Sequence, residues 1–235
     1  MRKFSQLLED TRNEFLKLEY HDQLSPKLWN SDQTLKEGIK ERLIPLAISW
    51  MRFAKLPLES IVDITLTGGI SNFNWTSLSD IDLHILVDFD KIPITDHEFL
   101  HEYIMGKKNE WSHEHDDITV EGFPVEIYAQ DIRETTPREQ GVYSLTNDQW
   151  NVKPKNLHID YNERFDLVAG VKEFADQIRN VSDLATAKQL KQQIKDMRSQ
   201  SLKYGSEFSR GNLIFKALRN RGDLLKLKNW IKEHE

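Results

Sequence analysis

The chain has 235 residues, of which 38% are hydrophobic and 30% charged, with a formal net charge of −6. This balance is that of a globular protein whose core is large enough to fold without cross-links, and the absence of cysteine excludes disulfides and thiolate metal sites. The N-terminal stretch MRKFSQLLED lacks the apolar segment of a secretory signal, and no apolar run approaches the roughly 20 residues that span a bilayer, so we expect a cytoplasmic protein without a membrane partner.

The first half of the chain is predicted to mix helices with strands. Apolar residues at helical spacing predict a helix over 2–20 and a second one from Ser31 or Asp32 to about residue 55, kinked at Pro45. The spacing then changes to alternation, which predicts the following elements in order: strands 61–67 and 80–88, helix 95–111, and hairpin 117–130 turning at Glu121–Gly122. The turn-rich residues 131–160 are expected to form a short strand pair or an ordered loop.

The second half is predicted to be all-helical, with helices over 161–180, 183–203, 211–220 and 222–234. The fold class is therefore α+β: a small mixed β-sheet flanked by helices, followed by an all-helical C-terminal domain. We expect an α/β domain over residues 1–158, including the N-terminal helices, and a helical domain over 159–235.

Two aspartates stand one residue apart within the stretch LTGGISNFNWTSLSDIDLHIL. Side chains alternate along a strand, so Asp80, Asp82 and His84 share one face, and the apolar residues between them share the other. Two carboxylates this close repel each other unless a cation lies between them. Carboxylate oxygens, phosphate oxygens and water are the ligands that Mg²⁺ prefers, so the pair predicts a divalent cation site.

Two further features fit such a site. The Gly68–Gly69 turn allows the backbone to approach a phosphate closely, and exposed N–H groups in a turn form an anion site. In the hairpin, Glu126 points to the face opposite Val125 and Ile127, and joins the aspartates if its strand lies beside 80–88. Alone, each feature is more often structural: a glycine pair is usually a turn, and an Asp-x-Asp at a strand start is usually solvated.

In the order strand, Gly-Gly, loop, Asp-x-Asp, strand, helix and strand with Glu, the pattern resembles the nucleotidyltransferase superfamily. That superfamily includes DNA polymerase β, minimal nucleotidyltransferases, antibiotic adenylyltransferases and CCA-adding enzymes, and the resemblance covers about residues 60–130. The segments SDIDLHI, VEIYAQD and GVYSL also resemble a subgroup of uncharacterised, often phage-encoded nucleotidyltransferases, over about residues 40–230. The resemblance implies a nucleotidyltransferase-like sheet.

The resemblance also implies an activity: transfer of NMP from an NTP, with ATP the expected donor, to a hydroxyl acceptor, with release of pyrophosphate. Two Mg²⁺ ions, or Mn²⁺, would be bound by the catalytic carboxylates Asp80, Asp82 and Glu126. Five residues would contact the donor nucleotide: Gly68, Gly69, Ser71, Asn72 and Ser79. The acceptor is open between an RNA or tRNA end, a protein and a small molecule.

The sequence departs from the superfamily pattern at two points. The turn ends in Gly69 where many members have serine, and the following loop lacks the arginine that many members carry. A catalytically degenerate nucleotide-binding regulatory module is therefore one alternative. A metal-dependent nuclease that uses the same three acids is another.

Other residues are also candidates for chemistry. His97 and His101, four residues apart on a predicted helix, offer imidazoles for zinc together with His113 and His115, provided that the fold brings the two pairs together. His84 is expected to pack beneath the site, with substrate contact as the alternative.

Three aromatic residues are open between stacking on a nucleobase and packing: Trp75, Tyr143 and Trp150. For Trp150 we expect packing between the two halves of the chain.

Charge is unevenly distributed along the sequence. From Lys188 to Glu235 there are 12 basic and 5 acidic residues, whereas the rest of the chain has 20 and 33. The positive segment suggests a polyanionic ligand, with solvated helix faces as the equal alternative. The basic residues considered for phosphate or RNA binding are Lys203, Arg210, Lys216, Arg219 and Arg221.

Overall fold

The structure is a computed structural model that describes residues 15–134, 140–204 and 207–235. Its contacts divide the chain into two compact units. One unit is His21–Asn156, and the other consists of Leu157–Glu235 together with the described residues that precede His21. The contact division thus lies between Asn156 and Leu157, whereas the expected domain boundary is 158/159, and the described residues up to Tyr20 group with the C-terminal helices and not with the sheet.

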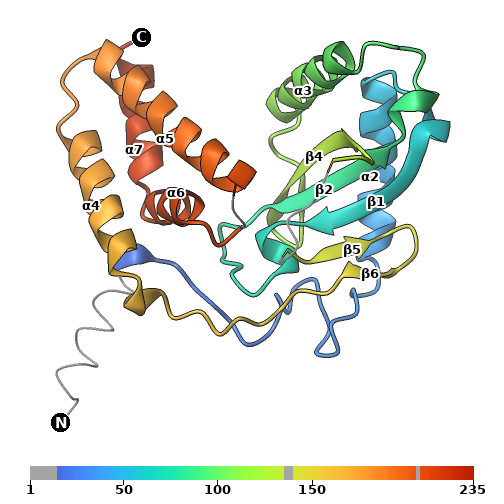
Figure 1. Ribbon diagram of the computed structural model, residues 1–235, viewed down its shortest axis with the longest axis horizontal. Coiled ribbons are helices and arrows are strands. Elements are labelled where there is room, and N and C mark those ends of the chain that lie inside the picture. The colour runs from blue at the N-terminus through green and yellow to red at the C-terminus, as the bar shows by residue number, and fades with distance from the viewer. Residues whose placement is uncertain (1–14, 135–139, 205–206) are drawn as a thin grey trace. The chain divides into compact units, whose positions relative to one another are not determined.

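The unit His21–Asn156 contains a six-stranded mixed sheet with two α-helices (Figure 1). Its elements are α2 (Ile39–Phe53), β1 (Ile61–Thr67), β2 (Ile81–Val87), α3 (His97–Glu114), β3 (Thr119–Val120), β4 (Phe123–Asp131), β5 (Val142–Ser144) and β6 (Gln149–Val152). The predicted strands, the helix after them and the short strand pair are thus confirmed. The predicted hairpin is confirmed too, and its turn residues Glu121 and Gly122 both have left-handed backbones, with φ of 54° and 81°.

The helices near the N-terminus differ from the prediction. Residues 2–14 of the predicted first helix lie outside the described residues, and the chain leaves the helical conformation at Lys17, whose φ is 50°. The second helix begins at Ile39 and not at 31–32, because the Asp32 carboxylate accepts hydrogen bonds from the backbone N–H and hydroxyl of Thr34 and so forms a turn. From Ile39 the helix continues through Pro45 as one element.

The strand order is β3-β4-β2-β1-β5-β6, and β2 pairs with β1 antiparallel and with β4 parallel. Helix α3 connects the parallel strands β2 and β4, so the three elements form a βαβ unit. In such a unit the helix runs antiparallel to the strands. The end of α3 therefore returns to the level where β2 and β4 begin, and its start lies where they end.

The two faces of the sheet differ in character. Along β2, the residues Ile81, Leu83 and Ile85 are fully buried, while the residues between them are partly exposed. Helices α2 and α3 contact each other as well as β4, so they cover the same, apolar face (Figure 1). The polar face carries Asp82 and His84, as the alternation predicts.

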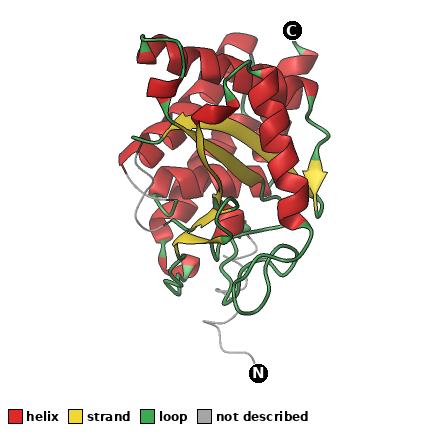
Figure 2. Cartoon of the chain, turned by 90° about the vertical axis from the view of Figure 1, so that its right-hand side faces the viewer, coloured by secondary structure: helices red, strands yellow, loops and turns green. Residues whose placement is uncertain are grey.

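The second unit is all-helical and has a core of its own. Its helices are α4 (Phe165–Arg179), α5 (Leu184–Tyr204), α6 (Arg210–Asn220) and α7 (Asp223–Glu233), shown in red with the other helices in Figure 2. Leu16 and Leu18 from the N-terminal side are buried in the same apolar cluster as Leu213 and Leu218. Among the described residues, none of the helices combines the length and the apolar character that crossing a membrane requires. The predicted fold class, a mixed sheet with flanking helices followed by helices, is confirmed.

Candidate metal centre

Three carboxylates converge on the polar face of the sheet, where β2 and β4 begin. Asp82 lies directly opposite Glu126 in the parallel pairing of β2 and β4, and opposite Thr67 in the antiparallel pairing of β2 and β1. Asp80 precedes β2 by one residue and faces the same way. One oxygen of each of Asp80, Asp82 and Glu126 lies within 4.8 Å of the others, and all three residues are partly exposed. Such a set of hard oxygen donors fits a divalent cation.

The glycine turn lies against Asp82 on the β1 side. Gly68 has φ 72° and ψ −164°, a conformation that is essentially restricted to glycine. A Cβ atom built on Gly68 would lie 1.6 Å from Oδ2 of Asp82. The absence of a side chain at Gly68 is therefore what allows Asp82 to hold its position, and Gly69 begins the short 3₁₀ turn that follows.

The side chains predicted to contact the donor nucleotide are mostly engaged in shaping the loop. Asn72 donates from Nδ2 to the carbonyl of Gly68 at 2.6 Å and accepts at Oδ1 from the N–H of Gly141 at 2.9 Å. Oγ of Ser79 accepts from the N–H of Thr76 at 2.9 Å. These bonds fix the loop between β1 and β2, and a role of Asn72 and Ser79 in nucleotide binding stays a prediction.

Several buried polar atoms around the turn lack a hydrogen-bond partner among the described residues. They are Oγ1 of Thr67, Oγ of Ser71 and both amide atoms of Asn74. Leaving such a group unsatisfied costs about 1–3 kcal/mol, so a concentration of them in one loop calls for an explanation. Of these residues, Thr67 is the β1 partner of Asp82, and Ser71 lies in the 3₁₀ turn that follows Gly68.

Lys108 supplies a positive charge to the site and was not among the sequence-based candidates. Its Nζ lies 2.5 Å from Oε1 of Glu126 and 4.5 Å from the centroid of the Tyr128 ring. The side chain is only 20% exposed, so it is held and not freely solvated. The signal that could have identified it is topological: a lysine late in the helix of a βαβ unit returns to the ends of the strands that carry the acids.

His84 follows Asp82 on the same face and has a packing role, the one favoured from the sequence. Its ring meets that of Tyr128 edge-on at 4.6 Å. Burial lowers the pKa of His84 to about 4, although the polar groups of Gln130 and Glu126 favour its charged form. Burial likewise raises the pKa of Tyr128 far above its usual value. Both side chains are therefore neutral near pH 7.

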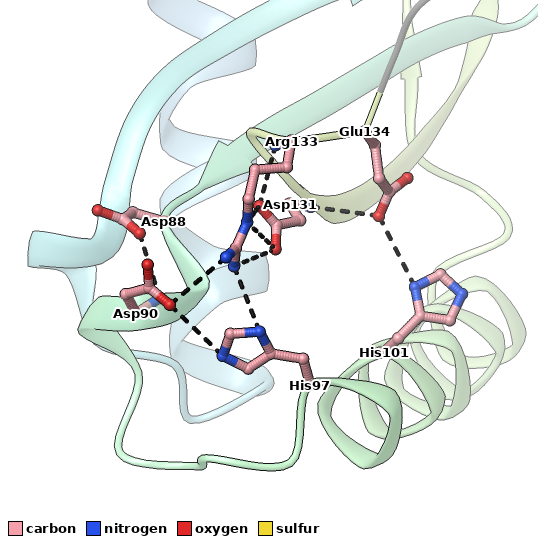
Figure 3. Close-up of polar contacts among 7 residues, drawn as sticks. All are labelled: Asp88, Asp90, His97, His101, Asp131, Arg133 and Glu134. Atoms are coloured by element: carbon pink, nitrogen blue, oxygen red, sulfur yellow. Dashed lines mark hydrogen bonds and ion pairs between the residues drawn. The ribbon is translucent and has the colours of Figure 1, made fainter.

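Residues 97–101 read HEFLH and match the H-E-x-x-H spacing of helical zinc sites, but the surrounding geometry does not support a zinc site. The start of α3 lies at the other end of the strands, where Figure 3 shows His97 beside Asp90 and Arg133, and His101 beside Glu134. Arg133 places a fixed positive charge at the centre of this group. Within residues 15–134, 140–204 and 207–235, no group of His, Asp and Glu other than the carboxylate triad brings three ligand atoms as close together.

The aromatic candidates make packing contacts within the sheet unit. Trp150 stacks on Trp29 at 4.7 Å, and Tyr143 meets both rings edge-on at 5.1 Å. Trp29 in turn donates from Nε1 to the carbonyl of Ile70 at 2.9 Å, so the aromatic cluster braces the glycine loop. Trp75 stacks on His21 at 3.9 Å.

Most of the basic residues considered for RNA binding are engaged inside the helical unit. Lys216 pairs with Glu207, Arg210 pairs with Asp166, and Arg221 pairs with Asp223 while also donating to the carbonyl of Phe15. Leu213, Leu218 and Leu227 of the same helices are buried in the core of this unit.

Fold and site together define an α+β protein with a three-carboxylate centre beside a glycine turn. No protein-family model matches the chain, and a search of curated proteins finds no match. Among solved structures, the chain is similar to the STING-associated CdnE c-di-GMP synthase from Capnocytophaga granulosa, with 14% identity, 99% of each chain covered and a TM-score of 0.23. A likeness of this size bears on neither the fold nor the activity of this chain, so the function is inferred from the geometry of the site.

Proposed function

We propose that the protein is a metal-dependent nucleotidyltransferase that transfers NMP from an NTP, with ATP as the expected donor, to a hydroxyl acceptor. The observation that carries the proposal is the convergence of Asp80, Asp82 and Glu126, with ligand atoms within 4.8 Å of one another, beside the turn at Gly68. The sheet unit, His21–Asn156, would be the catalytic domain. The acceptor class is an RNA or tRNA end, a protein or a small molecule.

The three carboxylates and the glycine turn would have different roles, set by their positions. Asp80 and Asp82 would hold Mg²⁺ or Mn²⁺ together with the donor triphosphate, and Glu126 would hold metal on the β4 side. Bound divalent ions supply charge neutralisation at the phosphates and make the acceptor hydroxyl a better nucleophile. The backbone of Gly68 and Gly69 would lie against the donor phosphates, with Ser71 nearby as a neutral donor. Much of the rate would come from this positioning.

Transfer of NMP from the NTP to the acceptor hydroxyl requires no further reactant. A bond forms between the acceptor oxygen and the α-phosphorus, and the bond from that phosphorus to the β-phosphate bridge oxygen breaks. The nucleotide stays on the acceptor, pyrophosphate leaves, and the acceptor proton passes to solvent.

The test uses purified protein, each α-labelled NTP in turn, Mg²⁺, and RNA, protein and metabolite fractions as acceptors. We expect label to move to one fraction with release of pyrophosphate, and Asp82→Asn to abolish this transfer while leaving the fold intact. Asp90→Asn is the matched control, because it removes the same charge from an acid at the other end of β2 whose side chain is 68% exposed.

Three results would contradict the proposal, each in its own way. Turnover by the Asp82→Asn variant would remove the carboxylates from the mechanism. Shortened nucleic acid without pyrophosphate would indicate a nuclease. NTP binding without transfer to any fraction would indicate a regulatory module.

A further inference from the structure

The ion pair between Lys108 and Glu126 gives the carboxylate triad an internal cation. Nζ of Lys108 lies 2.5 Å from Oε1 of Glu126, and the contact joins the late part of α3 to β4. Counting formal charges, three carboxylates and one ammonium leave a charge of −2 at the site. The ammonium thus already provides part of the neutralisation that the triad requires.

We propose that Lys108 competes with the divalent cation for Glu126, so that metal binds fully to the triad only when Lys108 leaves that carboxylate. The inference rests on the proposed function in one respect, that the triad is a metal site. In this scheme Lys108 acts only through Glu126 and is not itself a ligand of the metal.

The sheet order places Lys108 on one side of the centre. Strand β2 lies between β1 and β4, so the glycine turn that follows β1 and the Lys108–Glu126 pair on β4 flank Asp82 from opposite sides. If the donor phosphates lie at the glycine turn, Lys108 faces the acceptor side. Lys108 would then compete with the metal ion that would activate the acceptor hydroxyl.

Competition follows from the distances. A Mg²⁺ ion binds a carboxylate oxygen at about 2.0–2.1 Å. An ion bound to Oε1 of Glu126, whose distance to Nζ is 2.5 Å, would therefore lie within about 5 Å of the ammonium. Even with the screening of bulk water, repulsion between charges of +2 and +1 at that separation corresponds to roughly tenfold in affinity.

The side chain is built to hold this position. The Lys108 ammonium lies over the ring of Tyr128, with Nζ 4.5 Å from the centroid, and the side chain is 20% exposed. Lys107, its neighbour on α3, is 23% exposed but points elsewhere, towards Phe53 and Glu110. The chain therefore offers a control with the same charge and similar exposure but no contact with the triad.

The experiment measures Mn²⁺ binding without nucleotide, by the paramagnetic resonance signal of free Mn²⁺. Lys108→Met keeps an apolar stem for Tyr128 and removes the charge, and we expect it to bind Mn²⁺ about tenfold more tightly than wild type. Lys107→Met should change the affinity by less than about twofold, because its charge lies outside the site. Lys108→Arg should keep the affinity of wild type.

A double variant isolates the pair. In a Glu126→Gln background, Lys108→Met should lose most of its effect, because the carboxylate for which Lys108 competes is gone. Unchanged or weaker Mn²⁺ binding by folded Lys108→Met would overturn the proposal and indicate that Lys108 orients Glu126 for the metal. Absence of Mn²⁺ binding by both proteins would also overturn it.

The outcomes separate this inference from the proposed function. If Lys108→Met gains no affinity while wild type transfers nucleotide, only the role of Lys108 is refuted. If Lys108→Met binds Mn²⁺ more tightly but wild type transfers no nucleotide to any acceptor, only the transferase assignment is refuted.

Discussion

Replacing Gly68 by alanine tests whether the glycine turn exists to accommodate Asp82. The new Cβ would lie 1.6 Å from Oδ2, 2.7 Å from Cγ and 3.2 Å from Cβ of Asp82. Ordinary van der Waals contact requires about 3.5 Å, so Oδ2 must move by roughly 2 Å. The Asp82 side chain can rotate away, and the clash therefore displaces a carboxylate of the proposed metal site more than it unfolds the protein.

Two magnitudes follow for Gly68→Ala. The backbone at φ 72° and ψ −164° is strained for any residue with a Cβ, which should lower the free energy of unfolding by about 1–3 kcal/mol. Misplacing a catalytic group by 1 Å costs about 100-fold in rate, so we expect transfer to fall by about 100-fold or more. Mn²⁺ affinity should fall with it.

Gly38→Ala is the matched control. Gly38 has a φ of 79° but no atom within 4 Å of its built Cβ. It should lose about 1–2 kcal/mol of stability through the left-handed backbone while keeping transfer and Mn²⁺ affinity. Urea denaturation, Mn²⁺ titration and initial rates on both variants separate the two effects. A folded Gly68→Ala protein with the metal affinity and rate of wild type would refute the role of the turn.

Two further predictions concern pH. The pKa of His84 is about 4 in the folded protein and 6.5 for an unperturbed histidine, so the unfolded chain binds the proton first as pH falls. The free energy of unfolding in EDTA should therefore drop by roughly 3 kcal/mol between about pH 6.5 and pH 4. Urea denaturation should show that His84→Asn lacks this pH dependence, and parallel pH profiles for the two proteins would contradict the assignment. The Arg133 guanidinium lowers the pKa of Asp131, which it holds through Nε and a terminal nitrogen (Figure 3). The stability from this pair is present above about pH 4 and lost as pH falls through the lowered pKa, so thermal melts of wild type and Arg133→Gln should differ at pH 7 and converge in acid; a difference that persists in acid would show that charge is not its cause.

The sequence by itself determined most of the local structure. The alternation in IVDITLT and DIDLHILVD located β1 and β2 to within a residue, and Glu121–Gly122 marked the hairpin turn. These features depend on the period of the apolar residues and on the dihedral angles that glycine allows, both of which are set by neighbouring residues. For the same reason, alternation gave the faces of Asp80, Asp82 and Glu126, whereas the resemblance to the nucleotidyltransferase superfamily joined them as one candidate set.

One local prediction failed, and one loop contact was not foreseen, where side chains offered the backbone another partner. The turn at Asp32 delayed the start of α2 because its carboxylate bonds to Thr34. The amide of Asn72 braces the loop between Gly68 and Gly141, a use that depends on a residue far along the chain. Spacing within the loop does not encode such partners.

Only the tertiary structure decided that the carboxylates meet. The parallel register of β2 and β4 places Asp82 opposite Glu126, and a shift by one residue would turn Glu126 to the apolar face. The same βαβ arrangement brings Lys108 to Glu126 and carries His97 and His101 to the far end of the strands. These contacts join residues distant in sequence, and the packing of the whole sheet unit fixes them, because local periodicity sets the face of a side chain but not its partner across the sheet.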